Sequence, residues 1–173
     1  MELCIDDALE VLTQTPAVLD ALLRGKSAPW LNARKTPESF SPIDVVGHLM
    51  HGELTDWIPR MRMILAYGDA RTFDPFDRFG FHALIAGKSV GTLLDEFSAL
   101  RRQSLDALRE LGVREADFAL RGRHPELGSV TLGNHLANWA VHDLGHIAQI
   151  VKTMAWEYRD ATGPWRAYTT ILD

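Results

Sequence analysis

Two histidines stand four residues apart in the C-terminal third of the chain, in the segment HDLGHIAQI at residues 142–150. The apolar residues around them recur as on one face of a helix, where residues i and i+4 lie over one another. The imidazoles of His142 and His146 can therefore converge on one point in space. Because imidazole is a common ligand of divalent metals, this spacing suits a shared metal ion.

A third ligand is expected for such a site, because catalytic zinc usually has three protein ligands and an open position for water. The best candidate is His48, which lies among the apolar residues Val45, Val46 and Leu49 and is predicted to face the core or its edge. A lone inward histidine is more often a hydrogen-bonded core residue, and HxxxH pairs arise often by chance. Spacing alone therefore leaves a metal site and a structural role as alternatives.

The remaining histidines are His51, His82, His124 and His135. His135 is the first substitute ligand, because it lies seven residues before His142 on the same helical stripe. His51, three residues after His48, is the next.

HDLGH also invites comparison with the zinc-protease signature HExxH, in which the residue after the first histidine is the catalytic glutamate. Here that residue is Asp143, one methylene shorter. Its carboxylate can orient a ligand histidine or accept a proton, or it can be solvated or contact a neighbouring helix. The missing glutamate and the lack of any sign of a strand-edge substrate cleft argue against protease activity.

Composition excludes several classes of protein. The chain has 173 residues, 46% hydrophobic and 24% charged, which predicts a single soluble domain over residues 1–173 with a sizeable core. The net charge of -5, with acidic and basic residues mixed, argues against nucleic acid as a partner. The single cysteine, Cys4, favours the reducing cytoplasm. Neither a secretion signal nor a membrane-spanning apolar run is expected.

Apolar residues recur at spacings of three and four, which predicts a mainly helical protein. Helices are expected from Ile5 to the closing Gly25 and over residues 41–67, 89–111 and 131–160. The first should restart or kink at Thr15-Pro16, an N-cap and N1 pair. The second should begin with a capping box of Ser41 and Asp44 and bend near Pro59. Four such helices predict an all-α four-helix bundle, whose metal sites are normally built on facing helices.

The connecting segments are predicted to be irregular. Loops are expected over residues 26–40 and 121–130, and a long loop over residues 68–88 has a length that indicates a role in covering something. Four aromatic residues should anchor this long loop, namely Phe73, Phe76, Phe79 and Phe81. The tail GPWRAYTTILD should dock on the bundle through Trp165, Tyr168 and Ile171.

Three segments together resemble the DinB-like superfamily of small bacterial metalloproteins: SPIDVVGHL, HDLGHIAQI and MAWEYRDATGPWRAY. They occur in the order and approximate spacing of that family. The resemblance implies a four-helix bundle of up-down-down-up type with long connecting loops. It maps the family's metal triad onto His48, His142 and His146 and argues against His51 and His135 as ligands. It also implies zinc or nickel as the divalent metal, and a homodimer.

Some members of the family are thiol transferases or isomerases that use a low-molecular-weight thiol, and many others have no known reaction. The resemblance therefore implies a metal-dependent enzyme that activates a thiol or water for reaction with a small-molecule substrate, of thiol S-transferase or hydrolase type. Three neutral imidazoles suit the activation of a thiol or water. They carry no charge, so the full positive charge of the ion polarises its fourth ligand.

Two other classes compete with an enzyme. One is a non-catalytic metal-binding or stress-response binding protein, in which Asp44, His51 or Gln149 closes the coordination shell. The other is a structural bundle with hydrogen-bonded histidines. An open coordination position favours the enzyme, and a closed one favours the binding protein. Two loop arginines could hold a carboxylate and one tryptophan could line a pocket, but such residues are more often solvated or in the core: Arg121, Arg123 and Trp139.

Overall fold

The structure is a computed structural model that describes residues 2–173. Its helices are α1 (Ile5–Leu23), α2 (Ala28–Leu31), α3 (Pro42–Thr55), α4 (Trp57–Tyr67), α5 (His82–Ile85), α6 (Val90–Leu111) and α7 (Leu132–Trp156). A hairpin of β1 (Arg121–His124) and β2 (Gly128–Thr131) precedes α7. Short 3-10 turns complete the chain at Gly68–Ala70, Glu115–Asp117, Gly163–Tyr168 and Thr170–Leu172. Among residues 2–173 no helix is both long and apolar enough to cross a membrane.

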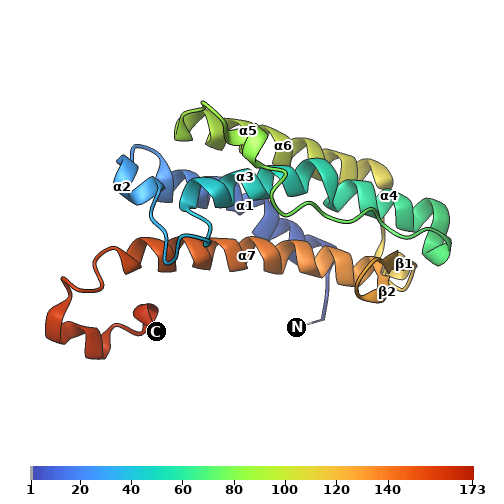
Figure 1. Cartoon of the computed structure of the whole chain (residues 1–173). Helices are drawn as coiled ribbons and strands as arrows, with labels where there is room; N and C mark the ends of the chain where they lie inside the picture. Colours follow the sequence, from blue (N-terminus) through green and yellow to red (C-terminus); the bar gives the residue numbers. More distant parts are fainter. Residues whose placement is uncertain (1) are drawn as a thin grey trace.

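Four long elements form the bundle: α1, the consecutive pair α3 and α4, α6, and α7 (Figure 1). α1 and α7 run in one direction, and α3, α4 and α6 run in the other. This is the up-down-down-up order. Because α4 and α6 are parallel, residues 68–88 must return along the length of the bundle between them, and the predicted long loop is this crossover (Figure 1).

The start of α3 fixes where His48 lies. Ser41 Oγ accepts a hydrogen bond from the backbone N–H of Asp44, and the Asp44 carboxylate accepts one from the backbone N–H of Ser41 at 2.8 Å. This reciprocal capping satisfies two backbone donors that a helix start leaves free. The predicted capping box is therefore confirmed, and it places His48 within the second turn, on a helix with a defined first residue.

The predicted helix over residues 41–67 is interrupted rather than merely bent. Pro59 has no N–H to donate to the carbonyl of Thr55, so the hydrogen-bond ladder fails there. The backbone departs from helical geometry at Asp56, with φ −111° and ψ −72°, and α4 begins at the next residue. Pro59 was predicted to bend one helix near its own position, whereas the structure has two helices with a break at Asp56, three residues earlier in the chain.

The predicted restart at Thr15-Pro16 is wrong, because α1 continues through both residues. Thr15 Oγ1 donates to the carbonyl of Val11 at 3.1 Å instead of capping a new helix. Pro16 cannot donate to the carbonyl of Leu12, and the guanidinium of Arg101 donates to that oxygen instead, at 2.8 Å. A side chain of another helix thus satisfies the acceptor that the proline leaves free.

The predictions on the connections need correction, since α2 lies within residues 26–40 and α5 lies within residues 68–88. Residues 121–130 are not an irregular loop, because most of them form an antiparallel hairpin that turns over residues 125–127, just before Gly128, whose φ is +72°. The tail is docked by Leu172, which is buried. Trp165 and Tyr168 are 74% and 83% exposed, so the prediction that they dock on the bundle is wrong.

Two adjoining clusters of buried side chains make up the core. One, around Phe81 and Phe97, lies toward α2 and α5, and the other, around Trp57 and Trp139, lies toward the hairpin. The ring of His48 lies 6.4 Å from that of Phe81, and the ring of His142 lies 5.1 Å from that of Trp57. The histidines therefore lie where the two clusters meet.

Candidate metal centre

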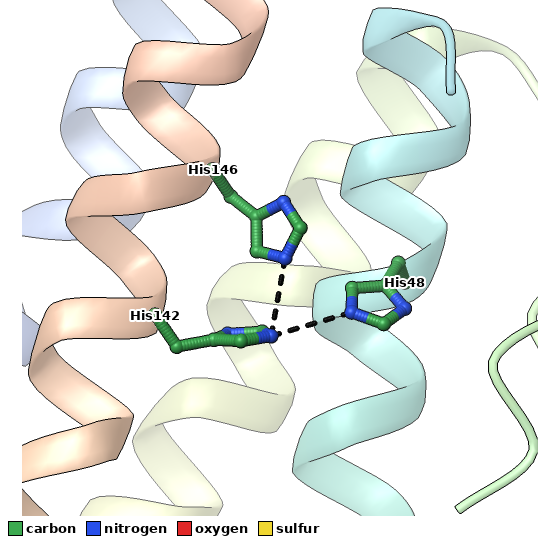
Figure 2. Close-up of side chains that lie close together, drawn as sticks. All are labelled: His48, His142 and His146. Carbon is green, nitrogen blue, oxygen red and sulfur yellow. Dashed lines mark hydrogen bonds between the residues drawn. The ribbon is translucent and has the colours of Figure 1, made fainter. Parts of the chain in front are cut away.

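Three imidazoles from two facing helices meet with their Nε2 atoms together (Figure 2). α3 supplies His48, and α7 supplies His142 and His146. His142 Nε2 lies 3.3 Å from His48 Nε2 and 3.1 Å from His146 Nε2. All three ligand atoms lie within 4.8 Å of one another. The sequence predicted this set of three, and the structure brings it together.

The separations fit a shared ion. A zinc–nitrogen bond is 2.0–2.1 Å long, so two ligands of a tetrahedral ion lie about 3.3 Å apart. The distances from His142 Nε2 to the Nε2 atoms of His48 and His146, 3.3 Å and 3.1 Å, match this value. Neutral imidazole also supplies a donor set that suits zinc, nickel, copper or iron.

A hydrogen bond from His146 to Gln149 sets the tautomer of His146. The Gln149 Oε1 atom lies 2.8 Å from His146 Nδ1 and can only accept, so the ring proton is on Nδ1. The Nε2 atom then presents a lone pair to the other two histidines. This is the form of histidine that binds a metal, with its second nitrogen oriented by a neighbouring acceptor.

Burial keeps the three rings neutral. Desolvation is the main cause that lowers the pKa of His48 to about 4 and that of His142 to about 3, and the positive charge of a protonated His146 is the second. Burial also lowers the pKa of His146. Near neutral pH the rings therefore need not lose a proton before they bind an ion.

The triad forms one wall of an open cleft of about 420 Å³. α7 contributes Asn138 and Gln149 beside the histidines, and the crossover contributes Phe76 and Arg78. The ring of Phe76 packs edge-on against that of His48 at 5.5 Å. The crossover thus covers one side of the site, as its length predicted, and the cleft is bounded by the crossover and the triad.

The three residues considered as a fourth ligand have other contacts. Asp44 serves in the capping box and forms an ion pair with Arg34. His51 packs against Phe76 with ring centroids 5.1 Å apart. Gln149 accepts from the outer nitrogen of His146 rather than facing the Nε2 atoms. None of these contacts closes the coordination shell from the protein side.

The substitute histidines lie outside the cluster. His135 is buried, and its Nε2 donates to the carbonyl of Trp57 at 3.1 Å, so it is a hydrogen-bonded core residue. His124 lies in β1, where its Nδ1 accepts from two backbone N–H groups of the hairpin turn. His82 lies exposed in α5. Arg121 and Arg123 are exposed on β1, and Trp139 is a fully buried core residue.

Asp143 is not solvated and does not line the cleft beside the triad. It is fully buried, and both of its carboxylate oxygens accept from the guanidinium of Arg101, at 2.5 Å and 3.0 Å. Arg101 also donates twice to Glu53, and Trp139 Nε1 donates to the same Glu53 oxygen at 3.2 Å. Of the roles considered for Asp143, contact with a neighbouring helix is the one observed.

This buried network was not predicted from the sequence, although the position of Arg101 indicates it. Arg101 occupies the apolar stripe of α6, with Leu94 and Phe97 before it and Leu105 and Leu108 after it. A charged residue at a core position requires a buried partner of opposite charge. The pattern could have predicted that an acidic residue from another helix would face it.

The fold and the triad define a helical-bundle protein with a three-histidine site of the kind that holds divalent metals. A model of the DinB superfamily matches residues 11–150. The chain belongs to the DinB superfamily.

Two solved structures share the fold. YfiT from Bacillus subtilis, described as "a probable metal-dependent hydrolase with an unusual four-helix bundle topology", has a TM-score of 0.74 at 21% identity, over 87% of this chain and 86% of YfiT. TT2238, a four-helix bundle protein, has a TM-score of 0.60 at 21% identity, over 86% of this chain and 98% of TT2238. At these identities the similarity establishes the fold.

A curated protein matches part of the chain. It is a methionine–tRNA ligase from Thermosynechococcus vestitus (strain NIES-2133 / IAM M-273 / BP-1), 37% identical over 79 residues. The match covers 45% of this chain and 14% of the ligase, so most of the ligase lies outside it.

The Gln149 contact leads to a first prediction. We expect Gln149→Leu to lower the zinc affinity about 10–100-fold, because the leucine cannot hold the tautomer and orientation of His146. Competition with a chromogenic zinc chelator measures the change. Gln103→Leu is the matched control, since Gln103 is exposed on α6, and it should keep the wild-type affinity. Equal affinity in the two variants would show that the amide does not orient His146.

Proposed function

We propose that this protein is a metal-dependent enzyme that binds a divalent ion, zinc or nickel, through His48, His142 and His146 and activates a thiol or water. The nucleophile then attacks a small electrophilic substrate. The observation that carries the proposal is the open cleft beside three converging neutral imidazoles. The description of YfiT as a probable metal-dependent hydrolase supports it.

The residues of the chain have separable roles in this proposal. The three imidazoles hold the ion, and Gln149 orients one of them. The rings of Trp57 and Phe76 pack against His142 and His48 and exclude water from the sides of the site. A bound divalent ion would lower the pKa of a thiol or water in the cleft and so supply the nucleophile at neutral pH.

Asp143 is not a general base in this proposal. Its carboxylate is 0% exposed and held by Arg101, so it cannot reach a proton in the cleft. This position corresponds to the catalytic glutamate of the HExxH signature, and its burial argues further against a protease-like mechanism.

The alternative is a non-catalytic metal-binding protein. Such a protein would close the shell with a fourth side chain, and the candidates for that role are held elsewhere by a capping box, an aromatic contact and a hydrogen bond. An accessible coordination position favours the enzyme.

Two assays on the zinc-loaded and nickel-loaded protein test the proposal. In the first, 2-mercaptoethanol reacts with 1-chloro-2,4-dinitrobenzene, where a carbon–sulfur bond forms and chloride leaves. In the second, water hydrolyses p-nitrophenyl acetate to p-nitrophenol and acetate. We expect metal-dependent acceleration in at least one assay, and none in His146→Ala. Rates equal to those of His146→Ala in both assays, with metal bound, would favour the non-catalytic protein.

A further inference from the structure

A second hollow of about 380 Å³ adjoins the metal cleft. The two share four lining residues, namely Asp56, Arg60, His124 and Asn138. The shared wall makes one trough that runs from the triad toward the β1–β2 hairpin. Asn138 lies one turn before His142 on α7, so it stands between the two parts.

The second hollow offers no free charge to a ligand. Its cation, Arg60, pairs with Asp56 at 3.0 Å and donates to the carbonyl of Asp74 at 3.2 Å. The same guanidinium lies over the ring of Phe73, with 5.2 Å between its carbon and the ring centroid. These contacts fix Arg60 and neutralise it, so an ionic group would leave water without gaining a partner of opposite charge.

Several neutral polar groups remain available in the hollow. His124 Nδ1 accepts two hydrogen bonds, each 3.2 Å long. Because Nδ1 is an acceptor, the proton of the neutral ring is on Nε2, which can donate. Asn134 Oδ1 accepts from the backbone of Thr131, which leaves its amide N–H groups as donors. Asn138 is exposed and offers both an acceptor and donors.

Apolar side chains complete the hollow, namely Phe73, Leu127 and Val130. Its volume lies in the range of small-molecule sites, which combine an apolar lining with a few placed polar groups. The lining therefore matches an apolar body with hydroxyl or amide groups and no charge.

We propose that this hollow is a binding subsite for the uncharged body of the substrate, an apolar group that bears a hydroxyl or amide. The reacting end of the same molecule extends past Asn138 to the triad. The subsite thus rests on the proposed function for its link to the reaction, and its own binding can be measured separately.

The experiment uses zinc-loaded protein with labelled methyl groups and three probes of similar shape: benzamide, benzoate and benzamidinium. Methyl resonances of Leu127 and Val130 report on the hollow and lie on the hairpin rather than at the triad. We expect saturable shifts with benzamide, and binding about tenfold weaker for the two ions. No saturable binding of benzamide, or equal binding of the ions, would overturn the proposal.

Two variants sharpen the test. Asn138→Ala removes an exposed amide and should weaken benzamide binding by about threefold to tenfold. Val130→Trp fills the hollow and should abolish the binding. Zinc content should stay at the wild-type value in both, and unchanged benzamide affinity in both would contradict the subsite.

The outcomes separate the two proposals. If benzamide binds in the hollow and neither reaction is accelerated, the enzyme proposal fails and the subsite stands. If a reaction is accelerated and benzamide does not bind there, the subsite fails and the enzyme stands.

Discussion

Protein purified without a chelator or a histidine tag will carry about one equivalent of divalent metal, and His48→Ala and His146→Ala will carry none. Each substitution leaves two imidazoles, and both helices must contribute for three ligands to meet. Loss of a ligand should weaken metal binding more than loss of the group that orients it. We therefore expect the metal affinity to fall by at least about 100-fold. Mass spectrometry of the purified proteins gives the metal content directly.

The matched control is His51→Ala. His51 lies on the same helix three residues after His48 and packs against Phe76 instead of facing the Nε2 atoms. It should retain the wild-type metal content. Metal retained by His48→Ala would place the site elsewhere, and wild-type protein that takes up neither zinc nor nickel would leave the histidines as core residues.

The second large effect is expected at Arg101. Arg101→Met should destabilise the fold by about 3–5 kcal/mol, because it leaves the buried carboxylates of Glu53 and Asp143 without a positive partner. The two carboxylates and the guanidinium are each no more than 1% exposed, so water cannot replace the lost contacts. Urea denaturation followed by circular dichroism measures the free energy of unfolding.

Two further proteins keep this prediction testable if Arg101→Met fails to fold. Arg102→Met changes the neighbouring exposed arginine and should alter stability by less than about 0.5 kcal/mol. The triple variant Arg101→Met, Glu53→Gln, Asp143→Asn removes all three charges and should recover most of the lost stability. A triple variant no more stable than Arg101→Met would show that the loss does not come from unpaired charge.

Much of the site could be predicted from local sequence signals. The capping box of Ser41 and Asp44 is complete within four residues. The spacing of His142 and His146 places both side chains on one face of their helix. Such features depend on nearby residues only. Joining His48 to the pair required the bundle architecture, which the apolar periodicity and the family resemblance supplied.

Other features depend on contacts between distant segments, and local patterns misjudged them. Thr15-Pro16 matches a helix start, but α1 continues because Arg101 satisfies the carbonyl that Pro16 leaves free. The hairpin was missed because its strands are four residues each and lack a clear alternation. The apolar tail predicted docking for Trp165, whereas the packed surface accepts Leu172.

The separation of the histidines along the chain has a consequence for folding. His48 and His142 are 94 residues apart, so the three-nitrogen site exists only after the last long helix has packed against α3. A species that lacks this contact offers at most two histidine ligands of the site, and the ion therefore binds the native state in preference to partly folded ones. Metal uptake should then follow the slow, non-local step of folding and shift the equilibrium toward the native bundle by mass action.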